Sequence, residues 1–206
     1  MPKITDASAM RQRIITATWA VIAAEGIQSV SIRRVAREVG STAGLITHYF
    51  KNKDELVTRA YRTVLDRMIG DAARRVAAPD GVIERLLAAI EAVEPTGREM
   101  KSFTIVLINF WSQAAFNPNF ARFCREDYRR WRRLIGRVIR EGISAGQLRA
   151  DTDVRRLCDV LTLLSDGLSV GMTLTPTAYS FRRREAILRQ VLRPFLRSAL
   201  RGAAIF

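Results

Sequence analysis

Histidine and cysteine are scarce in this chain of 206 residues, and their scarcity excludes several kinds of chemistry. His48 is the only histidine, so HExxH metal sites and schemes that need more than one imidazole have no candidates. Cys124 and Cys158 lie far apart without a third cysteine, which excludes a zinc site and a disulfide framework and predicts two buried, reduced thiols. The phosphate-binding patterns GxxxxGK[ST] and GxGxxG are also missing, so we expect no enzyme, metal or cofactor.

Long apolar runs are missing as well. The first ten residues contain no apolar core of the length that a secretory signal needs. The most apolar stretch, residues 160–174, is interrupted by Ser165, Asp166 and two glycines, which argues against a membrane span. We therefore expect a soluble, cytoplasmic protein with no membrane partner.

Lysine is rare, yet the chain is strongly basic. It holds 34 lysines and arginines against 20 acidic residues, a net charge of +14, and only four of the basic residues are lysines. Arginine carries a planar fork of donors that matches phosphate and carboxylate. The composition favours a polyanionic partner, although it does not separate nucleic acid from an anionic membrane surface.

No segment alternates apolar and polar residues for long enough to indicate a strand. Apolar residues instead recur at spacings of three and four, as at Ile14, Thr18, Val21 and Ala24, which is typical of amphipathic helices. The sequence predicts an all-α protein of about nine helices. Their expected ranges are 7–25, 32–39, 43–49, 53–77, 82–93, 98–115, 119–143, 153–173 and 180–200.

Two short helices near the N-terminus carry the most specific pattern. Ser31 can cap the first, Gly40 can end it in a left-handed conformation, and the second opens at Thr42 or Ala43. This is a helix-turn-helix arrangement, whose second helix is shaped to enter the major groove. We expect Leu45, Ile46 and Phe50 to anchor that helix in the core. The polar groups expected to point outward are those of Thr42, Thr47, His48 and Tyr49.

The segment that follows predicts a capped helix start. Asn52 can cap the next helix and Glu55 can return the bond, as in a capping box. The free amides there, together with Lys53, would form a phosphate clamp. Each of these residues alone could simply mark a helix end, but their order favours DNA binding.

The segment from Thr16 to Leu56 resembles the TetR family of one-component repressors, above all in the run from Tyr49 to Leu56, YFKNKDEL. Ser41 stands where the family usually has valine, and Ala43 offers no polar group, so direct base recognition would depend on few residues. The motif and the resemblance together give the candidate DNA-binding residues. These are Ser31, Arg33, Arg34, Thr42, Ala43, Gly44, Thr47, His48, Tyr49 and Lys53.

The rest of the chain resembles the TetR branch that contains the choline-responsive regulator of betaine synthesis, through residues 110–114, 117–118 and 164–168. The resemblance implies a DNA-binding domain over 1–53 and a ligand-binding, dimerising domain over 54–206. Aromatic walls near a carboxylate would suit a quaternary cation, whereas inward arginines would favour an anion or a neutral lipophile. The aromatic cluster could also be ordinary core. Candidate pocket residues are Tyr61, Phe103, Leu107, Asn109, Phe110, Trp111, Tyr128, Trp131, Asp166 and Met172.

The last two helices, 153–173 and 180–200, are apolar on more than one face, as expected when one side meets a partner chain. A two-fold dimer would place its recognition helices about 34–36 Å apart, or a multiple of that, on an imperfect palindrome. An effector would tilt helix 53–77 and release the DNA. Expected dimer contacts are Leu161, Leu168, Leu192 and Leu196.

Rows of arginine over 122–140 and 182–197 are interpreted as solvated faces that add long-range attraction to DNA. A basic protein that merely coats nucleic acid would explain the charge, but not the apolar helices over 98–115 and 153–173. An enzyme is disfavoured because His48 lies in the expected recognition helix. The favoured hypothesis is a homodimeric repressor that binds an operator in double-stranded DNA and responds to an unidentified small-molecule effector.

Overall fold

The computed structural model describes residues 3–77 and 81–197, and within these ranges the chain is helical, with one isolated bridge between Leu148 and Leu196 and no strand. This confirms the predicted all-α class. Three short 3-10 segments, η1 (Ile27–Ser29), η2 (Pro176–Ala178) and η3 (Arg193–Phe195), accompany the α-helices. The α-helices are α1 (Lys3–Glu25), α2 (Ile32–Val39), α3 (Ala43–Tyr49), α4 (Lys53–Arg75), α5 (Val82–Glu91), α6 (Gly97–Ala114), α7 (Pro118–Ser144), α8 (Val154–Leu174) and α9 (Phe181–Leu192).

Most helix ends lie within two residues of their predicted positions, and the two exceptions are at the ends of the chain. Helix α1 begins at Lys3 rather than residue 7. Helix α9 ends at Leu192, where the predicted helix continued to residue 200. Pro194 explains the early end, because it has no N–H for a helical bond and it lies in η3. Residues 198–200 of that predicted helix lie outside the described residues.

The chain forms two compact units. Unit 1 combines residues up to Arg67 with Thr96–Cys124, and unit 2 combines Met68–Pro95 with the chain from Arg125 onward. The expected division between residues 53 and 54 does not follow this grouping. The reason is that α6, distant in sequence, packs against α1 in unit 1.

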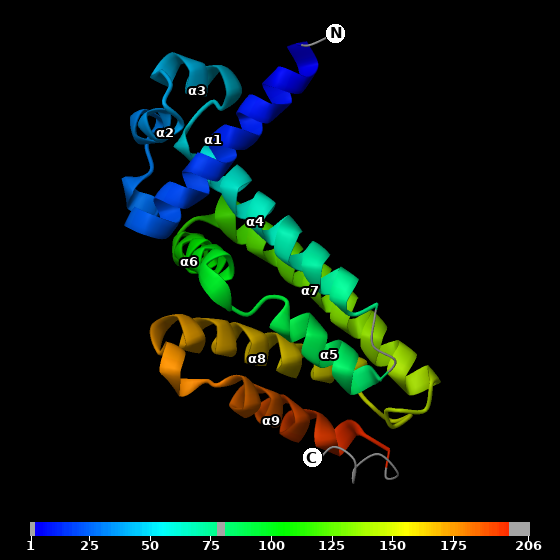
Figure 1. Cartoon of the computed structure of the whole chain (residues 1–206). Coiled ribbons are helices and arrows are strands. Elements are labelled where there is room, and N and C mark those ends of the chain that lie inside the picture. The colour runs from blue at the N-terminus through cyan, green and yellow to red at the C-terminus, as the bar shows by residue number, and fades with distance from the viewer. Residues whose placement is uncertain (1–2, 78–80, 198–206) are drawn as a thin grey trace. The chain divides into compact units, whose positions relative to one another are not determined.

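Unit 1 is built on α1. Helix α2 packs against α1, and α3 packs against α2, as Figure 1 shows for the labelled helices. On the other side, the Trp19 ring of α1 meets the Phe103 ring of α6 edge-on, with centroids 5.4 Å apart. Tyr61 of α4 stacks on Phe110 of α6 at 3.7 Å. The short helices α2 and α3 are therefore supported by α1, which packs in turn against α6.

Unit 2 has its own core, in which α5 packs against α9. A Cβ atom at Gly142 of α7 would overlap the side chain of Val82, so the close approach of the start of α5 to α7 requires glycine there. Both cysteines are free, as predicted, but only Cys158 is buried; Cys124, in unit 1, is half-buried.

Helix α8 is the one helix in the described part of the chain that is long and apolar enough to cross a membrane by length and composition. One face of this helix packs in the core of the protein. Leu157 and Leu161 are fully buried in the unit, and Cys158 and Leu168 nearly so. Its Asp166 accepts a hydrogen bond from Tyr128 of α7 at 2.7 Å.

Candidate nucleic-acid interface

Helix α2 is fixed at both ends by the residues that the sequence indicated. The Ser31 hydroxyl accepts a hydrogen bond from the Arg34 N–H at 3.1 Å. At the other end Gly40 adopts φ 71° and ψ 43°, a left-handed conformation that favours glycine, and the Ser41 N–H donates to the Ala36 carbonyl at 2.9 Å. These contacts fix the turn between α2 and α3.

Helix α3 begins at a second cap, where the Thr42 hydroxyl accepts from the Leu45 N–H at 3.2 Å. Ile46 and Phe50 are buried, which confirms both as inward anchors, while Leu45 is half-buried. The helix is thus clamped by its cap and by the core. Its outer face is formed by the exposed residues Thr42, Gly44, Thr47 and His48 with the half-buried Ala43 and Tyr49.

Two features of this outer face suit base edges and phosphates. The rings of His48 and Tyr49 meet edge-on with centroids 5.1 Å apart, so each ring restricts the rotation of the other side chain. The Thr47 hydroxyl donates to the Gly44 carbonyl at 3.0 Å and retains its lone pairs for a further bond. Donors, acceptors and an aromatic edge therefore lie on the outer face of one short helix.

The start of α4 forms the expected capping box with one difference. The Asn52 side chain accepts from the Glu55 N–H at 2.9 Å, and the Glu55 carboxylate accepts from the N–H of Lys51, also at 2.9 Å, rather than from that of Asn52. Lys53 lies beside this cap and donates its Nζ to the Gln28 carbonyl at 3.3 Å. The ammonium group is therefore held at the amide-rich end of α4.

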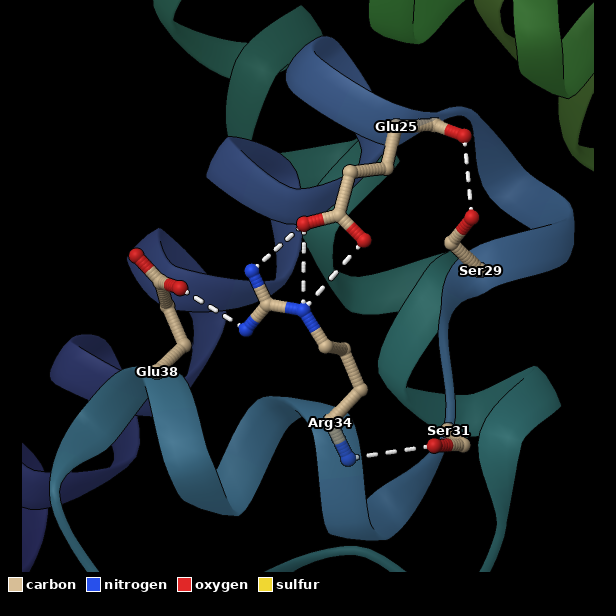
Figure 2. A network of polar contacts seen from close by, with 5 residues as sticks. All are labelled: Glu25, Ser29, Ser31, Arg34 and Glu38. Atoms are coloured by element: carbon tan, nitrogen blue, oxygen red, sulfur yellow. Dashed lines mark hydrogen bonds and ion pairs between the residues drawn. The ribbon is translucent and has the colours of Figure 1, made fainter.

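Arg34 differs from its neighbour Arg33. Its guanidinium donates to Glu25 of α1, with the shortest contact at 2.6 Å, and to Glu38 of α2 at 2.8 Å (Figure 2). The hydrogen bonds with these carboxylates raise the pKa of Arg34, and the bond from Arg34 lowers the pKa of Glu25. Arg33 is exposed. Arg34 therefore braces α2 against α1, whereas Arg33 is accessible to a phosphate.

Asn109 of α6 makes a contact that no sequence pattern indicated. Its side-chain oxygen accepts from the Ile27 N–H at 3.1 Å, and its side-chain nitrogen donates to the Ile105 carbonyl at 2.9 Å. Ile27 opens η1, the turn between α1 and α2. The bond ties α6 directly to the helix-turn-helix segment.

The ten candidate pocket residues fall in both units. In unit 1 the side chains of Tyr61, Phe103, Leu107 and Phe110 are buried, and Trp111 is half-buried. The stack of Tyr61 on Phe110 continues to Phe120 of α7, whose ring lies 4.8 Å from that of Phe110. These aromatic rings pack on one another, and Asn109 bonds to the backbone as described above.

The other four candidates lie in unit 2. Trp131 and Met172 are buried, and the Tyr128 hydroxyl donates to Asp166. Burial is the main cause that raises the pKa of Asp166, while the bond from Tyr128 and the charge of Arg132 partly oppose it. A partly desolvated carboxylate near aromatic side chains is a candidate recognition group for a small molecule.

The four leucines expected at a dimer contact occupy a different environment from the one anticipated. Leu161, Leu192 and Leu196 are fully buried within the chain, and Leu168 is 3% exposed. They are core residues of unit 2 and do not form an exposed face. Among the described residues, the large apolar side chains that are exposed on α8 and α9 are Leu163, Leu174 and Phe181.

Two family models match this chain. Residues 14–60 match the family described as bacterial regulatory proteins, tetR family. Residues 82–197, more than half of the chain, match the family described as BetI-type transcriptional repressor, C-terminal. The first match contains α2, α3 and the start of α4, and the second contains α5 to α9.

Individual relatives agree with these matches. The regulator BetI of Cronobacter sakazakii is 27% identical, with 99% of this chain and 97% of the relative covered. BetI 2 of Chromohalobacter salexigens is 30% identical over 85% and 83% of the two chains. A transcriptional regulator from Saccharomonospora viridis, solved in complex with choline, superposes with a TM-score of 0.83 at 25% identity, covering 92% and 99%. The chain thus belongs to the TetR family of DNA-binding transcriptional regulators, with a C-terminal domain of the BetI type.

Proposed function

We propose that this regulator is a cytoplasmic repressor that binds a palindromic operator as a homodimer and releases it when a small molecule binds. The observation that carries the DNA-binding part is the clamped helix α3. It is capped by Thr42 and anchored by the buried Ile46 and Phe50, and it exposes Thr47 and His48. A helix that is anchored in the core on one side and exposes polar side chains on the other fits the major groove.

The residues of this interface have separate roles. Thr47, His48 and Tyr49 would contact base edges, because their side chains supply donors and acceptors at the exposed face of α3. Arg33 and Lys53 would contact phosphates and fix the register. Arg34 would act indirectly, by holding α2 against α1 through Glu25 and Glu38.

Dimerisation is proposed through α8 and α9. The contacts would come from Leu163, Leu174 and Phe181, which are 70%, 73% and 54% exposed. Large apolar side chains with such exposure on two consecutive helices are typical of a partner interface. The two-fold axis would then place two copies of α3 on successive turns of one duplex face.

The effector is proposed to contact Asp166 and Tyr128 in the C-terminal domain. The relative from Saccharomonospora viridis was solved with choline, a quaternary cation. Burial raises the pKa of Asp166, so a cation beside this carboxylate would favour its charged form. Anionic and neutral lipophilic compounds are the competing classes.

Selection from a random duplex library tests the proposal. The wild-type protein should enrich an imperfect inverted repeat whose half-sites lie about 34–36 Å, or a multiple of that, apart. Choline, an aromatic acid and a neutral lipophile are then titrated against the complex, with tryptophan fluorescence as a second readout. Enrichment of no sequence would reject the operator, and failure of every compound class to weaken the complex would reject effector release.

A further inference from the structure

Helix α7 carries a row of exposed arginines that the helix-turn-helix segment does not explain. Arg125, Arg129, Arg133 and Arg137 follow one another at intervals of four residues, and all four side chains are exposed. We call them the α7 arginine row. At about 100° and 1.5 Å per residue, they occupy roughly a third of the circumference and extend over about 18 Å.

Carboxylates leave this row largely unneutralised. Of the acidic residues that α7 contributes to unit 2, Asp127 is buried and lies near Arg130, and Glu141 pairs with Arg85. Glu126, at the edge of the row, joins no ion pair within the described ranges, and neither does any of the four arginines. Among the described residues, their guanidinium groups make one hydrogen bond, from Arg129 to the Arg125 carbonyl at 3.2 Å.

The charge of unit 2 shows the same excess. Residues 68–95 and 125–206 hold 20 arginines and no lysine against 13 acidic residues, a net charge of +7, which is half of the total. Like charges four residues apart destabilise a helix. A row of four such charges therefore calls for an anionic partner that offsets the repulsion.

We propose that the α7 arginine row is a second DNA-binding surface, which contacts the phosphates of duplex DNA independently of base sequence. Over about 18 Å a duplex presents roughly ten phosphates, enough to engage all four guanidinium groups. Arginine suits this contact because its fork can bond two phosphate oxygens at once.

The environment of the row favours DNA over other polyanions. A helix that lies on a membrane needs an exposed apolar face, but the apolar residues of α7 in this unit, such as Trp131, Ile135 and Val138, are buried in the protein. An acidic protein partner would ordinarily be anchored by exposed aromatic residues, and the exposed large apolar residues in the described ranges lie outside α7. Duplex DNA is a polyanion that this regulator already binds.

The test compares two variants of the full chain with the same loss of charge. The first replaces Arg125, Arg129, Arg133 and Arg137 with glutamine. The control replaces four exposed arginines elsewhere in unit 2 that make no ion pair within the described residues, namely Arg75, Arg155, Arg156 and Arg182. Affinity for a duplex that lacks the operator is measured by fluorescence anisotropy over a range of salt concentrations, and circular dichroism verifies folding.

Each lost phosphate contact lowers the slope of log affinity against log salt by about 0.9, so we expect a fall of about 3.6 for the row variant and less than about 1 for the control. At 0.1 M salt the row variant should bind at least tenfold more weakly. An equal effect of both variants, or none from the row variant, would overturn the proposal. Loss of binding to anionic phospholipid vesicles with unchanged DNA affinity would also overturn it.

Two further experiments identify which DNA the row contacts and separate its role from that of the helix-turn-helix segment. If the row contacts DNA that flanks the operator, longer flanks should tighten binding only when the row is intact; if it contacts another duplex, two labelled duplexes should be captured together. Neither behaviour in the wild type would contradict the proposal. The variant Thr47→Ala/Lys53→Ala should lose operator preference and about 0.9 of the salt slope, but it should keep the larger part of the slope that depends on the row. Failure of the helix-turn-helix segment and failure of the row are therefore distinguishable.

Discussion

The side-chain oxygen of Asn109 accepts a hydrogen bond from the backbone N–H of Ile27 at 3.1 Å, which joins α6 to the turn between α1 and α2. Asn109→Ala would leave a partly buried N–H without its partner, at a cost of about 1–3 kcal/mol. We expect a lower melting temperature and weaker operator binding. Asn109→Asp keeps an acceptor oxygen and should retain most of both. Unchanged operator affinity in the alanine variant would show that the bond does not position the DNA-binding segment.

Arg33 and Arg34 are adjacent in sequence, but replacing each with alanine should affect different properties. Arg33→Ala should lower the salt slope of DNA binding by about 0.9 and leave the melting temperature unchanged. Arg34→Ala should lower the melting temperature, because it removes the brace to Glu25 and Glu38.

The pH dependence gives a second measure of the Arg34 brace. Arg34 lowers the pKa of Glu25 below its ordinary 4.5, so this stabilisation is full above pH 4.5 and is lost as the pH falls through the lowered pKa. The stability difference between wild type and Arg34→Ala should therefore shrink in acid. Equal melting temperatures at neutral pH would refute the structural role.

Asp166 should destabilise the ligand-free protein at neutral pH. Burial raises the pKa of Asp166 above its ordinary 3.8, so the folded state binds the proton more tightly than the unfolded state does. The loss of folding stability caused by the charged carboxylate is complete above the raised pKa and is relieved as the pH falls toward 3.8. Asp166→Asn, which can still accept from Tyr128, should be more stable than wild type at pH 7 and equal to it in acid. Urea unfolding at several pH values measures this, and a variant less stable at pH 7 would contradict it.

Leu163 and Leu161 provide a matched pair on α8. Leu163 is 70% exposed and Leu161 is fully buried. Leu163→Glu should leave the fold intact but raise the dimer dissociation constant at least tenfold, about 1.4 kcal/mol. Leu161→Glu should unfold the chain, because it buries an unpaired charge. Sedimentation and circular dichroism distinguish the two outcomes, and an undisturbed dimer in Leu163→Glu would place the interface elsewhere.

The sequence predicted the parts of the fold that depend on local chemistry. Ser31, Gly40 and Thr42 mark helix ends through bonds to residues a few positions away, and the structure contains each of these caps. Apolar periodicity likewise located the longer helices. The overlong prediction for α9 ignored a local rule, since Pro194 should have ended that helix.

Local sequence rules could not predict contacts between segments that are distant in the chain. Asn109 lies 82 residues from Ile27, and no pattern in either segment points to the other. Arg34 had the charge and the sequence position expected of a DNA contact, but in the structure it pairs with Glu25. This pairing depends on the angle between α1 and α2, which no local pattern predicts. The burial of Leu161 and Leu192 was missed for a similar reason, because an apolar helix face looks the same whether the chain itself or a partner covers it.

Helix α3 is proposed to select the DNA sequence while Lys53 supplies charge, and one comparison of variants tests these two roles most directly. Affinities of wild type, Thr47→Ala and Lys53→Ala are measured on the enriched operator and on a scrambled duplex over a range of salt concentrations. Lys53→Ala should weaken both duplexes alike and lower the salt slope by about 0.9, whereas Thr47→Ala should reduce the preference for the operator, by about 1–3 kcal/mol if it loses a base contact, at an unchanged slope. Equal operator preference in all three proteins would contradict the assignment of α3 as the recognition helix.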